Sequence, residues 1–170
     1  MGFPSMEDFL KNFDIRKLAG YIKTIGLAEF IKHAMKVPWF RRQLFQYLTE
    51  MGSAFRRNYE ITHTKFILNR STFRIEIEMP EEHRSKFEER FYNLIEALQN
   101  QHGALFKLFA EEYELKEISC VVTGTGVTLE FAGGEKLVSS IGEFLEDVKE
   151  KLEEGGVEIV RESGEEEEGK

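Results

Sequence analysis

The chain has 170 residues and a formal net charge of −8 at pH 7, which allows one well-buried domain and opposes long-range attraction to polyanions. Hydrophobic residues make up 41% of it, but no run approaches the roughly 18 apolar residues of a membrane span. The start lacks the basic and apolar regions of a secretory signal. The single cysteine, Cys120, lies in an apolar run, which predicts a buried thiol and a reduced, cytoplasmic protein.

Residues 5–51 are predicted to form a helical segment divided by Gly26 and Pro38. Ser5 and Asp14 are typical N-cap residues, and Pro38 suits the first turn of a helix. Apolar residues recur at helical spacing after each of these positions, and Gly52 is predicted to end the last helix. So much apolar surface must be buried, either against the sheet or against a partner.

The pattern changes to that of strands after residue 54. Phe55, Tyr59 and Ile61 alternate with polar residues, which predicts one bent strand or two over 55–68, and 69–71 reads as a turn. Alternation over 72–79 predicts the next strand. Pro80 then ends that strand, and apolar residues at helical spacing predict a helix over 81–101.

The second half of the chain repeats this arrangement. Residues 105–113 could be a helix or a strand, and their glutamate content favours a helix. Two strands follow between 117 and 133, joined by a hairpin turn at Thr125 and Gly126. Gly133 and Gly134 then introduce a helix of about four turns, whose apolar residues run from 137 to 152. A short strand is predicted at 156–161.

A hairpin followed by a long helix therefore occurs twice, over 54–101 and, with the final strand, over 117–161. This predicts the α+β class, with an antiparallel sheet and helices packed on one face, preceded by the helical segment. We expect one domain over 1–162 and a disordered acidic tail over 163–170.

Two resemblances accompany this pattern. The sequence has 28 Glu against 3 Asp, and this usage, with few thermolabile residues, resembles that of small uncharacterised proteins of hyperthermophilic archaea. The element order is similar to that of the small acidic chaperones of type III secretion systems and their YbjN-like relatives. The second resemblance implies a chaperone-like, protein-binding role, although a fold does not fix a function.

No local motif indicates catalysis, a cofactor or a metal. The glycine-rich run 123–126 precedes a strand, whereas a phosphate-binding loop must lead into a helix. Gly133 and Gly134 do precede a helix, where free N–H groups could hold an anion, but every helix has such groups. The four histidines are too scattered to predict a zinc site, and His83 is expected to be exposed.

Charge is unevenly distributed along the chain. Residues 16–74 carry 12 Lys and Arg against 3 Glu, a net of +9, whereas 81–170 carry 10 against 23 acids, a net of −13. Basic and aromatic residues that alternate are typical of nucleic-acid binding. The alternative is that the arginines face the acidic half, in the same chain or in a dimer. The candidate binding residues are Lys36, Trp39, Arg41, Arg42, Arg56 and Arg57.

The leading hypothesis is a non-enzymatic protein that binds another protein and forms a homodimer, with no catalytic residues, cofactor, metal or membrane contact. The first alternative is an RNA-binding module that uses residues 36–59. The second is an enzyme or small-ligand protein whose pocket is assembled from residues far apart in the chain.

Overall fold

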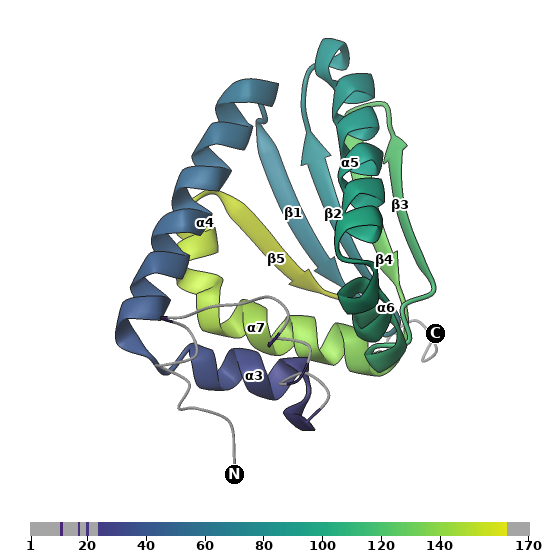
Figure 1. Cartoon of the computed structure of the whole chain (residues 1–170). Helices are drawn as coiled ribbons and strands as arrows, with labels where there is room; N and C mark the ends of the chain where they lie inside the picture. Colours follow the sequence, from purple (N-terminus) through teal and green to yellow (C-terminus); the bar gives the residue numbers. More distant parts are fainter. Residues whose placement is uncertain (1–10, 12–16, 18–19, 21–23, 163–170) are drawn as a thin grey trace, which may run out of the picture. The chain divides into compact units, whose positions relative to one another are not determined.

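A computed structural model describes residues 11, 17, 20 and 24–162. The chain forms two compact units, Met1–Leu48 and Thr49–Lys170, and each is described by itself. The boundary falls within one helix, α4 (Pro38–Tyr59) (Figure 1). The helices predicted over 5–25, apart from a few positions, and the predicted tail lie outside the described residues.

The first unit contains α3 (Leu27–Ala34) and the beginning of α4. Gly26, with φ 85°, precedes α3, and this left-handed backbone conformation favours glycine. Phe30 and Ala34, one turn apart, are buried and pack with Trp39 and its neighbours. Pro38 begins α4, as predicted, because its fixed φ and missing N–H suit the first turn.

The second unit is built on a five-stranded sheet with the order β3-β4-β2-β1-β5. All neighbouring pairs are antiparallel except β1 and β5, which are parallel. The predicted α+β class is confirmed, and the sheet is mixed because the last strand joins in parallel. The elements of this unit are β1 (His63–Leu68), β2 (Thr72–Glu78), α5 (Glu81–Gln101), α6 (Gly103–Glu112), β3 (Glu117–Val122), β4 (Gly126–Ala132), α7 (Glu135–Glu154) and β5 (Val157–Arg161).

Apolar and charged side chains alternate along the strands, so the two faces of the sheet differ. On the helix-bearing face, Ile77 lies opposite Val127, and Leu129 opposite Cys120. These four buried side chains form one core with Phe87 of α5 and Tyr59 of α4. Residues that alternate with them form the charged face: His63, Lys65, Arg74, Glu76, Glu78, Glu130 and Glu158. Ile67 is an exception, since by register it lies on the charged face and yet is buried.

The switch from strand to helix at Pro80 is confirmed. β2 ends at Glu78, Pro80 is the N-cap residue, and α5 covers 81–101 as predicted. Phe87 is buried and Phe91 is partly buried against the same core, so the predicted apolar stripe faces the sheet. The helix favoured over a strand at 105–113 is confirmed as part of α6, and Tyr113 is the C-cap residue of this helix.

The prediction of a strand from residue 54 is wrong. α4 continues to Tyr59, Gly52 lies inside it, and the first strand begins only at His63. Phe55 and Tyr59 fit an alternating pattern, but they are also one helical turn apart. Both rings contact Phe87, with centroid distances of 6.4 and 5.1 Å. This packing against α5 favours the helix.

The hairpin between β3 and β4 is confirmed, and its glycine allows a close approach between strands. Thr123 accepts hydrogen bonds at Oγ1 from the N–H groups of Thr125 and Gly126. A Cβ at Gly126 would overlap the main-chain carbonyl of Ile77. Gly126 is therefore needed for the close approach of β2, rather than for a positive φ.

β3 is an edge strand of the sheet, and one side chain occupies part of that edge. The hydroxyl of Tyr92, from α5, accepts a hydrogen bond from the Cys120 N–H at 2.9 Å and lies 3.2 Å from the Cys120 carbonyl, to which it can donate. Both backbone groups of Cys120 are thus satisfied by a helix rather than by another strand.

Candidate functional site

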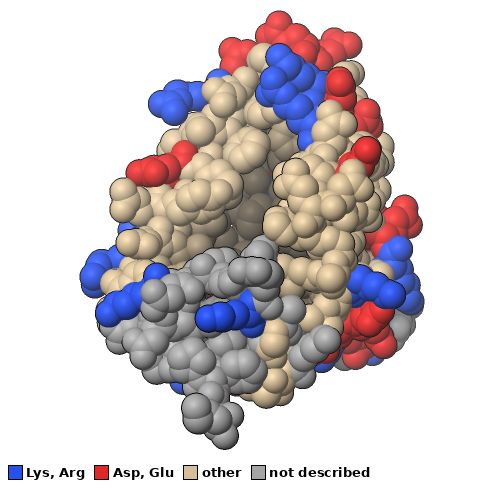
Figure 2. All heavy atoms as spheres, viewed as in Figure 1, with Lys and Arg blue, Asp and Glu red and all other residues tan. Residues whose placement is uncertain are grey.

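The helix-bearing face of the second unit is not covered evenly. In Figure 1, β1 and β5 lie between the second half of α4 on one side and α5 on the other. Figure 2, in the same view, shows that the surface is hollowed there. Phe66 and Ile159 lie on this face by register and are only partly buried. A hollow therefore remains between the two helices, over apolar strand residues.

Large apolar side chains from both helices lie beside this hollow. Arg90 donates to the hydroxyl of Tyr59 at 2.8 Å, so this side of α5 faces α4. Leu94 and Leu98 follow Arg90 at intervals of one turn and continue the same side of the helix. They are 57% and 38% exposed, and Phe55 on α4 is 43% exposed. We call Phe55, Phe66, Leu94, Leu98 and Ile159 the apolar trough.

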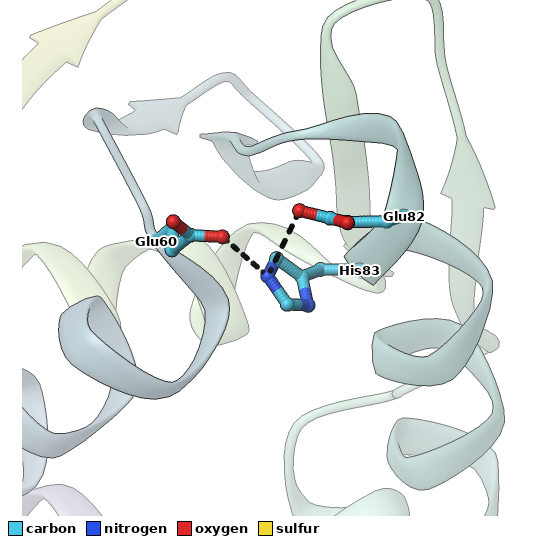
Figure 3. A group of neighbouring side chains, drawn as sticks. All are labelled: Glu60, Glu82 and His83. Atoms are coloured by element: carbon cyan, nitrogen blue, oxygen red, sulfur yellow. Dashed lines mark hydrogen bonds and ion pairs between the residues drawn. The ribbon is translucent and has the colours of Figure 1, made fainter.

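At one end of the trough, three polar side chains converge between the helices (Figure 3). Glu60 directly follows α4, and Glu82 and His83 lie in the first turn of α5. His83 Nε2 is 2.7 Å from Glu60 Oε2 and 3.8 Å from Glu82 Oε1. The ring of Tyr59 packs edge-on against that of His83 at 6.2 Å. His83, expected to be exposed, is therefore held by neighbours and is only partly exposed.

His63 has a different arrangement, although it also contacts two glutamates. Its Nδ1 lies 3.3 Å from Glu78 and its Nε2 lies 3.2 Å from Glu158. The two carboxylates therefore approach opposite nitrogens of the ring. This group links three strands across the charged face, whereas the one at His83 converges on a single nitrogen.

The six predicted binding residues are divided between the two units. Four of them, Lys36, Trp39, Arg41 and Arg42, belong to the first unit. There Trp39 packs beside the buried Phe30 and Ala34, so its ring helps to build the core. Arg41 and Arg42 are exposed, with the Arg41 guanidinium 5.1 Å from the ring of Phe45.

The other two predicted residues, Arg56 and Arg57, lie in the second unit and differ sharply. The Arg56 guanidinium donates to the carbonyl of Gly155, directly after α7, and to Ser53. A cation at this position also interacts favourably with the C-terminal end of the helix dipole. Arg57 is exposed. A nucleic-acid role for the six residues stays a prediction, with structural partners for Trp39 and Arg56.

The buried cysteine predicted from the sequence is confirmed. Cys120 is 2% exposed, and burial, together with the charge of Glu88, raises the pKa of its thiol to about 11. The thiolate is the reactive form, so this side chain is inert at neutral pH and does not form part of a candidate site.

The glycines before α7 do not offer an anion site. The Gly133 N–H donates to the Ser71 carbonyl and the Gly134 N–H to the Tyr113 carbonyl. The carboxylate of Glu114 lies against Gly134, so one of the protein's own anions is at this helix start.

The trough and the His83 group were both missed from sequence, for different reasons. Leu94 and Leu98 belong to the predicted stripe of α5, but their exposure depends on what lies opposite. Glu60 and His83 are 23 residues apart, and no spacing rule connects them.

None of the helices described here is long and apolar enough to cross a membrane. No protein family, curated protein or solved structure matches this chain.

Proposed function

We propose that this is a non-enzymatic, chaperone-like protein of the cytoplasm that binds an apolar helix of another protein chain in the trough. The observation that carries this proposal is the exposure of Phe55, Leu94 and Leu98 beside a hollow. Exposed apolar side chains that lie together often mark binding surfaces. A helix with one apolar face is the partner that fits between two helices.

A second copy of the chain is the first partner to test. Basic residues dominate 16–74 and acidic residues dominate 81–170, and such segregated charge favours self-association, in which opposite charges of two copies can meet. The homodimer would then be the resting state, and a client protein would compete for the same trough.

Sedimentation velocity over a range of concentrations tests self-association. We expect a dimer for the natural chain and a monomer for the double variant Leu94→Glu, Leu98→Glu, because a glutamate in an apolar interface must be desolvated. Val121→Glu is the matched control, since Val121 is 55% exposed but lies on the charged face. Circular dichroism confirms that each variant is folded.

Client binding is tested by the aggregation of a heat-unfolded enzyme, followed by light scattering. The natural chain should suppress aggregation, the double variant should not, and Val121→Glu should behave as the natural chain. A strict monomer that leaves aggregation unchanged would overturn the proposal. If the double variant still suppressed aggregation, client binding would not take place in the trough.

A further inference from the structure

We propose that Glu60, Glu82 and His83 bind a divalent transition-metal ion such as Zn²⁺. The ligands would be Nε2 of His83 and one carboxylate oxygen from each glutamate, and water would complete the coordination. Imidazole nitrogen and carboxylate oxygen are ordinary ligands of this ion, and three protein ligands with an open position are a common set.

The distances suit such an ion. Ligands that lie about 2.0–2.2 Å from a tetrahedral Zn²⁺ are separated from one another by about 3.3–3.6 Å. His83 Nε2 lies 2.7 Å from the oxygen of Glu60 and 3.8 Å from that of Glu82, which brackets this separation. All three ligand atoms lie within 4.8 Å of one another. Small rotations of exposed glutamate side chains would therefore place them around one ion.

The direction of approach distinguishes this group from the one at His63. Both glutamates near His83 face the same ring nitrogen (Figure 3), so the lone pairs can point to a common centre. The glutamates near His63 face different nitrogens, so no single ion can replace both contacts. A histidine between two glutamates is thus not enough to indicate a metal site. The informative feature is that both carboxylates approach the same ring nitrogen.

The surroundings also favour a cation. Tyr59 is 5% exposed and fixes the imidazole edge-on, which lowers the entropy lost on binding. Two neighbouring cations are directed elsewhere, because Arg84 donates to the carbonyls of Met79 and Thr123, and Arg90 donates to Tyr59. The N-terminal end of α5 opposes a cation, but Glu81 and Glu82 in its first turn offset this.

An ion at this position would join the end of α4 to the start of α5. The two helices flank the apolar trough, so the metal would fix its width at one end. The ion would bind whether or not the trough is occupied.

The test uses the full chain, first stripped with a chelator and then titrated with Zn²⁺ in a calorimeter. We expect one saturable site per chain, and a thermal midpoint that rises with Zn²⁺ concentration because the ion binds only the folded state. Co²⁺ should give the visible absorption bands of a site with nitrogen and oxygen ligands.

Variants decide which residues bind the ion. Glu60→Gln keeps a polar group that can still bond to His83, and it should weaken Zn²⁺ binding at least about tenfold, as should His83→Ala. Glu81→Gln and His63→Ala are the matched controls and should bind as the natural chain does. Absence of saturable binding would overturn the proposal, as would affinity unchanged in folded Glu60→Gln or equal losses in His63→Ala.

Discussion

The two faces of the sheet in the second unit are formed by alternate residues of the same strands, yet their surroundings differ. On the helix-bearing face, Ile77, Val127 and Leu129 are at most 8% exposed. On the charged face, Arg74 and Glu76 keep 29% and 43% of their side chains exposed. Stabilisation by burial scales with the apolar area removed from water. The helix-bearing face therefore carries most of the stability, and the charged face, apart from the buried Ile67, can change at little cost.

The largest effect is expected from Phe87→Ala, which removes the ring between α4, α5 and the sheet. Phe87 is 8% exposed and contacts the rings of Phe55 and Tyr59. The cavity and the lost burial should lower the free energy of unfolding by about 3–5 kcal/mol in urea denaturation. Leu94→Ala on the same helix is the control, with a loss within about 0.5 kcal/mol. Equal losses would contradict the assignment of the core.

Arg56→Ala should have an intermediate effect, because Arg56 is a partly buried link between the end of α4 and the end of α7. Loss of a hydrogen bond from a charged donor should lower the free energy of unfolding by about 1–2 kcal/mol. The exposed neighbour Arg57 provides the control, and Arg57→Ala should change stability by less than about 0.5 kcal/mol. If the two variants were equally stable, Arg56 would be available for a binding role instead.

Arg74→Ala on the charged face should have the smallest effect. Arg74 is paired with Glu76 at 3.7 Å and with Glu162 at 3.6 Å, and all three side chains are partly exposed. Such pairs contribute about 0–1 kcal/mol, and added salt should reduce the difference further. A loss as large as that of Phe87→Ala would show that the two faces are not as different as their exposure indicates.

Much of the fold could be predicted because its signals are local. Pro80 cannot continue a strand inside a sheet, and the period changes at that residue, so the boundary between β2 and α5 was correctly placed. The end of α4 is not correctly predicted, because the spacing of Phe55 and Tyr59 fits the period of a strand as well as that of a helix. Contacts with residues far along the chain, such as Phe87, decide between them. The parallel pairing of β5 with β1 likewise depends on a distant strand.

The candidate sites were less predictable than the fold. Arg56 and Arg57 are adjacent and chemically identical, but one donates to Gly155 and the other is exposed. Composition cannot separate them, because the difference comes from the helix side on which each lies. The same holds for His63 and His83, whose neighbours are glutamates from other elements.

The hydrogen bonds of the Tyr92 hydroxyl affect the tendency of the protein to aggregate at high concentration. An edge strand is a template on which another chain can add its own strand, and repeated addition produces fibrils. Near Cys120, the neighbouring Val121 and Val122 are 55% and 38% exposed, which would help such growth. Because Tyr92 already occupies both backbone groups of Cys120, an incoming strand would have to displace it. One phenolic oxygen on a helix thus opposes the addition of a strand at the β3 edge of the sheet.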